Sequence, residues 1–176
     1  MARPCGREDI RVGAIGSSRA MSIVKLPWMS DEEVDALIGP QIICRIAFKG
    51  DEYPYLSPFR YVSMRGTLYF HFTDYGKKMR LIKQDDRCCV QIERYAPDLS
   101  SYSFVSLRGR LEEVTDPEER KKAVGLFRET GRTLSTRFLA AHGLDPKDGW
   151  GAFTVDKDLV IVKLVDVVEK VGLKNP

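Results

Sequence analysis

The segment Gln41–Phe72, "QIICRIAFKGDEYPYLSPFRYVSMRGTLYFHF", decides the fold. It contains three runs rich in β-branched and aromatic residues, and the dipeptides Gly50-Asp51 and Arg65-Gly66 between them predict tight hairpin turns. Turns this short leave no room for crossover helices. The three runs therefore predict antiparallel strands and argue against a doubly wound parallel sheet.

Strand and helix signals continue beyond this segment. Further strands are predicted at 87–95, 102–114 and 158–173. Helices are predicted at 30–39, 75–84 and 115–127, with partly helical structure at 131–151. The last strand is almost continuously apolar, which predicts burial on both of its faces. Six strands joined mostly by hairpins predict a mainly β fold with helical additions, a six-stranded antiparallel barrel.

Two of the predicted helices carry explicit signals at their N-termini. Ser30 precedes the first helix as its N-cap. The helix at 115–127 has Asp116 as N-cap, Pro117 at the first helical position and Glu119 where it would close a capping box.

The composition indicates one globular domain. Of the 176 residues, 43% are hydrophobic and 30% are charged, and a Gly-, Ser- and Arg-containing tail at 1–20 precedes a domain at 21–176. The net charge of +3 is too small to indicate nucleic-acid binding by electrostatics alone. No run reaches the roughly 18 apolar residues that span a membrane, and the tail lacks the apolar region of a secretory signal.

The cysteines and histidines do not predict a metal site. The four cysteines and two histidines show no CxxC pair and no spacing typical of metal ligands. They are Cys5, Cys44, Cys88, Cys89, His71 and His142. On a strand, the adjacent Cys88 and Cys89 point to opposite faces. Free thiols in a reducing cytoplasm are the simpler interpretation.

Two lysines occupy the first turn of the predicted helix at 75–84. Capping by Thr73 or Asp74 would place Lys77 and Lys78 at about the third and fourth positions, where free N–H groups already present partial positive charge. Folding gains nothing from cations there, whereas a phosphate would be held by both ammonium groups and by the N–H groups. The alternative is an ordinary surface helix whose lysines extend into solvent.

The strand before this helix offers further donors. Leu68, Phe70 and Phe72 share one face of the strand, and Tyr69, His71 and Thr73 share the other. The imidazole of His71 and the hydroxyl of Thr73 are candidate partners for the same anion. A lone histidine is more often a structural residue, so His71 is open to both interpretations.

The neighbouring strand carries two prolines. Pro54 and Pro58 lack the N–H that a central strand needs, so the sheet must have an edge or a bulge around Pro58. Unpaired backbone groups there are suited to a planar ligand, with Arg60 as a cation beside it. An exposed arginine on a twisted barrel rim is the alternative.

These segments occur in a familiar order: "DEYPYLSPFRYV" (51–62), "LYFHF" (68–72), "GKKMRLI" (76–82) and "DDRCCVQIE" (85–93). The pattern resembles the FMN-binding split-barrel superfamily of pyridoxamine 5′-phosphate oxidase-like proteins, and most of all the branch that includes the nitroimidazole-resistance proteins. The similarity covers most of the chain, from Met21 to Val171.

The resemblance implies a split barrel that forms a homodimer, with FMN in grooves at the dimer interface. It implicates these residues in cofactor binding: Ser57, Pro58, Phe59, Arg60, Tyr61, His71, Phe72, Thr73, Lys77, Lys78 and Trp150. The strand 57–61 would run along the flavin ring and ribityl chain. The segment 71–73 and Lys78 would approach the phosphate with Lys77 beside it, and Trp150 would pack by the flavin from the partner subunit.

The function that the resemblance implies is an FMN-dependent oxidoreductase. Electrons would pass from a reduced nicotinamide or similar donor through the flavin to a small electron-poor acceptor. His71 would be either a phosphate contact or a catalytic proton donor. True pyridoxamine phosphate oxidases end in an arginine-rich substrate motif, whereas this chain ends in "EKVGLKNP", which argues against vitamin B6 oxidation.

Two other functions stay open at this point. One is a non-catalytic flavin- or haem-binding module for sensing, storage or electron relay, in which His71 would be an axial haem ligand. The other is a domain that kept the fold and lost the cofactor.

Overall fold

Six antiparallel strands form a closed barrel in the computed structural model, which describes residues 25–140, 144–154 and 159–175. The strands are β1 (Ile43–Phe48), β2 (Tyr55–Met64), β3 (Thr67–Thr73), β4 (Arg87–Tyr95), β5 (Tyr102–Glu113) and β6 (Leu159–Lys174). The helices are α1 (Asp31–Ile38), α2 (Lys77–Gln84), α3 (Pro117–Gly131), α4 (Arg137–Ala140) and the 3₁₀ helix η1 (Pro146–Ala152). The predicted antiparallel barrel with helical additions is confirmed. The predicted tail at 1–20 lies outside the described residues.

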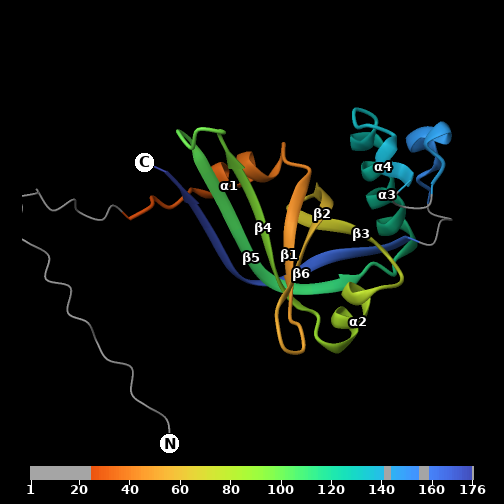
Figure 1. Cartoon of the computed structure of the whole chain (residues 1–176), viewed down its shortest axis with the longest axis horizontal. Coiled ribbons are helices and arrows are strands. Elements are labelled where there is room, and N and C mark those ends of the chain that lie inside the picture. Colours follow the sequence, from red (N-terminus) through yellow and green to blue (C-terminus); the bar gives the residue numbers. More distant parts are fainter. Residues whose placement is uncertain (1–24, 141–143, 155–158, 176) are drawn as a thin grey trace, which may run out of the picture.

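The strands follow the order β1-β2-β3-β6-β5-β4 around the barrel. The 16-residue strand β6 closes it by pairing with β3 on one side and with β5 on the other. Figure 1 shows α1 at one end of the long strands and α3, α4 and η1 grouped at the other, with α2 below the barrel. We call α3, α4 and η1 together the helical cap.

Apolar side chains form two clusters on either side of the barrel wall. Leu68, Phe70 and Phe72 of β3 point into the barrel interior, which is the main core. Tyr69 and His71 alternate with them and point outward, where the helical cap covers them. The predicted alternation along β3 is therefore confirmed, and its outer face is a second buried surface.

Strand β2 changes partners halfway along its length. Residues Tyr55–Arg60 pair with β1, whereas the ladder with β3 covers only Tyr61–Met64. Pro58 lies in the first half, where the ladder with β3 has not begun. This is the edge that the proline predicted, because a residue without an N–H is tolerated where one side of a strand is unpaired.

The two predicted hairpins differ in length. Arg65 and Gly66, both with positive φ (53° and 79°), form the two-residue turn between β2 and β3, which confirms the prediction. The connection from β1 to β2 runs from Lys49 to Pro54 and is not a tight turn, so that prediction is wrong. Gly50 lies so close to the Tyr53 carbonyl that a Cβ there would come within 1.8 Å of the oxygen.

The expected double-sided burial holds for only part of β6. Residues 159–164 are mostly buried, but residues 166–170 are exposed, including Val167 (47%) and Val168 (81%). A β-bulge opposite Arg108 and Arg110, where Asp166 has a φ of 48°, turns the strand away from the core at this point. In the described part of the chain, no helix is long and apolar enough to cross a membrane.

Candidate functional site

Helix α2 begins directly at the two lysines. Its N-cap is Gly76, with a φ of 93°, and no side chain of the described residues caps the first turn. The predicted cap at Thr73 or Asp74 is therefore wrong, and Lys77 and Lys78 are the first and second helical residues. Glycine is suited to this position because its positive φ costs little. The first-turn N–H groups and the positive end of the helix dipole are thus left to an external acceptor.

The side chains of the two lysines reach opposite strands. Lys78 Nζ donates a hydrogen bond to Thr73 Oγ1 of β3 (2.7 Å) and another to the Tyr75 carbonyl (3.3 Å). Lys77 Nζ lies 5.0 Å from the ring centroid of Tyr55 at the start of β2. Partial burial lowers the pKa of Lys78, an effect that the nearby carboxylate of Asp74 opposes. A bound anion would favour the charged ammonium.

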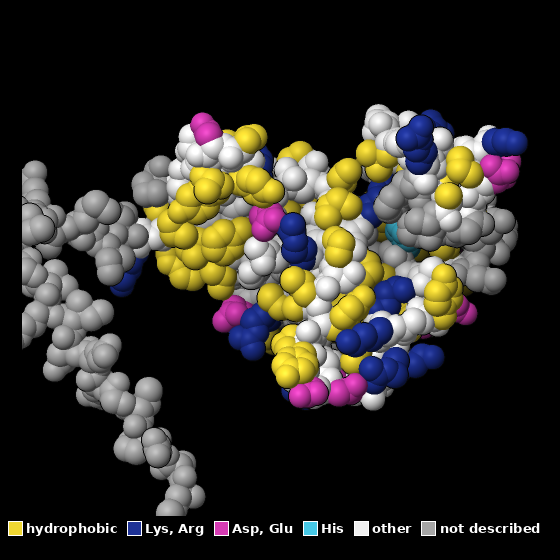
Figure 2. Space-filling view, viewed as in Figure 1, with side chains coloured by type: hydrophobic (Ala, Val, Ile, Leu, Met, Phe, Trp, Pro, Cys, Tyr) yellow, Lys and Arg dark blue, Asp and Glu magenta, His cyan; other side chains and the backbone are white. Residues whose placement is uncertain are grey.

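Next to the start of α2, the first half of β2 has an edge that does not pair with β3. The edge runs over Tyr55–Arg60, and it includes Ser57, Pro58 and Phe59 of the predicted site. Figure 2 shows Lys and Arg side chains gathered around α2 on the same side of the barrel. An unpaired strand edge beside an uncapped, lysine-bearing helix N-terminus combines backbone hydrogen-bonding groups with an anion site.

Arg60 and His71 form a second cluster on the outer face of β2 and β3. The ladder between β2 and β3 ends at the pair Tyr61 and Phe70. Arg60 and His71 are the next residues on each strand, so they lie across from each other. Arg60 is 3% exposed and His71 5% exposed. The Phe127 ring is shared: its centroid lies 5.4 Å from Arg60 Cζ and 4.9 Å from the imidazole centroid.

The helical cap encloses this cluster. Arg60 Nη2 donates to the Phe127 carbonyl (2.9 Å) and to Thr130 Oγ1 (2.6 Å). The Trp150 ring lies 4.7 Å from the guanidinium carbon, and the Phe153 ring lies 5.1 Å from His71, centroid to centroid. Trp150 is 5% exposed, so its ring packs within its own chain and is not on the surface, where it could contact a partner subunit.

Apart from Ser57 and Pro58 on the edge of β2, the predicted site residues divide into three groups. Thr73, Lys77 and Lys78 meet at the start of α2, and Arg60, His71 and Trp150 meet beneath the cap. The side chains of Phe59, Tyr61 and Phe72 pack in or against the barrel interior, where they can reach a ligand only through their backbones.

Several residues of the second cluster were not predicted from the sequence. They are Phe127, Thr130 and Phe153. The apolar stripe of α3 that includes Phe127 predicts a packed helix face but not what that face covers, and no motif marks Thr130 or Phe153. In the described ranges, no group of histidines, cysteines and carboxylates is arranged to hold a metal ion.

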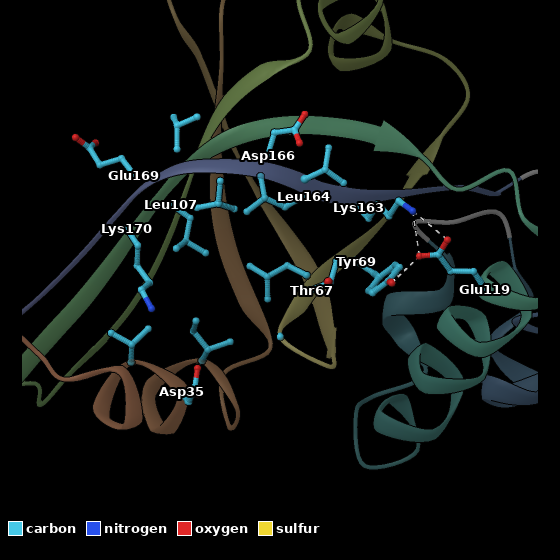
Figure 3. A pocket seen from close by; sticks show the side chains of 17 residues that line it. Asp35, Thr67, Tyr69, Leu107, Glu119, Lys163, Leu164, Asp166, Glu169 and Lys170 are labelled. Carbon is cyan, nitrogen blue, oxygen red and sulfur yellow. Dashed lines mark hydrogen bonds and ion pairs between the residues drawn. The ribbon is translucent and has the colours of Figure 1, made fainter.

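A separate groove of about 650 Å³ lies between α1 and β6 (Figure 3). Both lysines that line it are paired with carboxylates: Lys163 with Glu119 (3.0 Å) and Glu112 (3.3 Å), and Lys170 with Asp31. A phosphate would have to compete with these carboxylates. The start of α2, where the lysines meet a hydroxyl and free N–H groups, is the better anion site.

The fold and the lysine-bearing helix define the class of protein as a split barrel. The family model described as pyridoxamine 5′-phosphate oxidase matches residues 30–142. The chain therefore belongs to the pyridoxamine 5′-phosphate oxidase family, as the resemblance implied. Comparison with curated protein sequences gives no match.

Solved structures share the fold at low sequence identity. An FAD-binding protein from Mesorhizobium loti is 19% identical, with a TM-score of 0.62 over 85% of this chain and 96% of the other. A protein described in terms of 5-nitroimidazole antibiotic resistance, from Bacteroides thetaiotaomicron, is 16% identical, with a TM-score of 0.60 over 89% and 96%. The FAD-binding protein from Mycobacterium smegmatis is 14% identical, with a TM-score of 0.55 over 85% and 100%.

Proposed function

We propose that this chain is an FMN-binding flavoprotein of the reducing cytoplasm. It would pass electrons from a reduced nicotinamide or similar donor to a small electron-poor acceptor. The observation that carries the proposal is the uncapped start of α2, where Lys77 and Lys78 flank an unpaired edge of β2. Membership of the family and the flavin named for two structural neighbours support the same cofactor class.

Each part of the proposed site matches one part of FMN. Lys77, Lys78, the Thr73 hydroxyl and the first N–H groups of α2 would hold the phosphate. The unpaired backbone at 57–60 would hydrogen-bond polar atoms of the flavin ring. FMN has a single phosphate at the end of its ribityl chain. The site likewise has a single phosphate position, at the end of the β2 edge that would hold the ring.

The chemistry itself comes from the flavin, which accepts and donates two electrons as hydride or in single steps. The protein binds and orients the ring and excludes water. His71 lies beside Arg60 under the cap, whereas Lys78 contacts Thr73, so the geometry favours proton donation by His71 over phosphate contact. An imidazole can hold a proton on one ring nitrogen and accept one on the other, which suits it to proton transfer.

Two exposed side chains beside the proposed cofactor edge support a homodimer with FMN at the interface. Leu56 (60% exposed) and Tyr75 (70% exposed) are large apolar or aromatic side chains beside the proposed cofactor edge. A second copy would bury them and complete the enclosure of the ring.

Replacing both lysines tests the phosphate site. We expect Lys77→Ala with Lys78→Ala to purify with little or no flavin, because the phosphate would lose both ammonium groups. The matched control is Lys121→Ala with Lys122→Ala, a second adjacent pair, exposed on α3. The flavin-to-protein ratio is read from absorbance, and the mass of the ligand released by denaturation distinguishes FMN from FAD.

Two outcomes would contradict the proposal. Unchanged flavin content in the Lys77/Lys78 double variant would show that the flavin phosphate does not bind at the start of α2. A Soret band in place of flavin absorbance would favour the haem-binding module instead. Thermal unfolding of both double variants shows whether a loss of flavin reflects a loss of the fold.

A further inference from the structure

Arg60 is a buried cation that the fold leaves only partly hydrogen-bonded. The residue is 3% exposed, and within the described part of the chain both of its side-chain hydrogen bonds come from Nη2. The N–H groups of Nε and Nη1 are buried and have no hydrogen-bond partner in the ranges that the structure describes. Among the described residues, no carboxylate forms an ion pair with the guanidinium.

This arrangement is costly for folding. A buried donor without a hydrogen-bond partner loses the hydrogen bonds that water gave it, and a buried charge without a counter-ion costs more. Burial lowers the pKa of Arg60 to about 10, which still leaves the guanidinium charged at neutral pH. A methionine would fill the same space without the penalty, so the charge points to a role in binding.

Aromatic side chains pack around Arg60. Trp150 and Phe127 stack near the guanidinium, and the His71 imidazole lies beside it. Cation–π contact offsets part of the desolvation cost but satisfies none of the N–H groups, which lie in the guanidinium plane. A flat anion would provide acceptors in that plane and aromatic contact above it.

Trp150 is placed as a movable cover over this space. It stands between Gly149, whose φ is 59°, and Gly151, in a short 3₁₀ helix with non-helical backbone at Gly149. Its indole N–H reaches the Leu134 carbonyl at 3.4 Å, a long hydrogen bond. The glycines on both sides give this short segment the backbone freedom to swing the indole aside.

We infer that Arg60 is a recognition residue for a small planar organic carboxylate, which reaches the guanidinium when Trp150 moves aside. The inference rests on the proposed function, because this carboxylate would belong to the electron acceptor or donor rather than to the cofactor. A guanidinium is matched to carboxylate geometry, and the phosphate already has its own cations at α2.

The experiment uses benzoate as the probe and benzamide as its uncharged counterpart. Trp28→Phe leaves Trp150 as the only tryptophan of the chain, so its fluorescence reports on the cover. We expect benzoate to change the Trp150 emission in a saturable way and benzamide not to. In the same background, Arg60→Met should abolish the benzoate response, and Arg60→Lys should weaken binding by about tenfold or more.

Arg128→Met, an exposed arginine next to Phe127 on α3, is the matched control and should keep the response. Equal responses to benzoate and benzamide, or a benzoate response retained in both Arg60 variants, would overturn the inference. So would loss of flavin in the folded Arg60 variants, because Arg60 would then belong to the cofactor site. An Arg60-dependent benzoate response in a protein without flavin would support the inference while contradicting the proposed function.

Discussion

At the residue scale, the position of Trp150 depends on a glycine beneath it. A Cβ at Gly131, the last residue of α3, would lie 2.4 Å from Cδ2 and Cε3 of the indole. Only a residue without a side chain lets the ring lie over Arg60 as it does. The position of the Trp150 ring over the buried guanidinium therefore depends on Gly131 as well as on Trp150.

Replacing Gly131 should destabilise the protein by displacing Trp150. We expect Gly131→Ala to lower the free energy of unfolding by about 1–3 kcal/mol, the usual cost of forcing extra volume into a packed site. Gly125→Ala on the same helix meets no atom within 4 Å and should instead stabilise by about 0.5–1 kcal/mol. Urea unfolding measures both. Equal stability of the wild type and Gly131→Ala would show that Trp150 does not pack on α3.

The start of α2 shows what the sequence could and could not predict about single residues. It identified Lys77 and Lys78 as the unusual feature, because cations at a helix N-terminus oppose the dipole. It placed the cap wrongly at Thr73 or Asp74, because the propensity of these residues for the N-cap outweighed that of Gly76. The Thr73 hydroxyl instead accepts from Lys78, a contact five residues away that capping rules do not consider.

At the element scale, α3 is tied to the barrel through Glu119. The N-cap Asp116 accepts from the Glu119 N–H as predicted, but the Glu119 carboxylate does not complete a capping box. It accepts from Tyr69 Oη (2.7 Å) and from Lys163 Nζ (3.0 Å), which come from β3 and β6. The capping-box prediction is wrong because these tertiary partners offer the carboxylate a hydroxyl and a positive charge.

This tie should make stability depend on pH. The Tyr69 hydroxyl and then Lys163 lower the pKa of Glu119 below its ordinary value of 4.5. A carboxylate with a lowered folded-state pKa contributes stability above its unfolded pKa and loses it as pH falls through the folded one. The contribution should therefore be complete near neutrality and disappear progressively below about pH 4.5.

Glu119→Gln tests this contribution. The variant should be less stable than the wild type by roughly 1 kcal/mol at pH 7, and the difference should shrink as the pH is lowered toward 3. Chemical denaturation across this pH range measures it. Glu118→Gln, exposed on the same turn, is the control. A wild-type advantage that stays constant down to pH 3 would show that the Glu119 charge is not involved.

At the scale of the whole molecule, the barrel could be predicted because its information is local. Arg65-Gly66 fixes one hairpin, strand alternation fixes the faces of β3, and Pro58 marks the half of β2 that does not pair with β3. The cap could not be predicted, because its position over Arg60 and His71 depends on contacts between residues far apart in the sequence, as from Arg60 to Phe127, which are 67 positions apart. No local pattern records such contacts.

The proposed dimer would cover the exposed side of the cofactor edge on β2. Leu56 lies in the half of β2 that pairs with β1 but not with β3, and it is 60% exposed, which is unfavourable for a monomer but suited to an interface. Leu99, at 63% exposure, lies in the turn between β4 and β5 and not in the proposed site. The two leucines therefore separate an effect on the interface from a general effect of surface charge.

Leu56→Glu should convert the dimer to a monomer and lower the flavin content with it. A carboxylate buried against the partner would lack a counter-ion, and we expect the dimer dissociation constant to rise by about tenfold or more. Size-exclusion chromatography with light scattering measures the assembly, and absorbance measures the flavin-to-protein ratio. Leu99→Glu should leave both unchanged. A Leu56→Glu protein that remains dimeric with full flavin would place the interface elsewhere, whereas a wild type that is monomeric and still holds flavin would show that one copy suffices to enclose the ring.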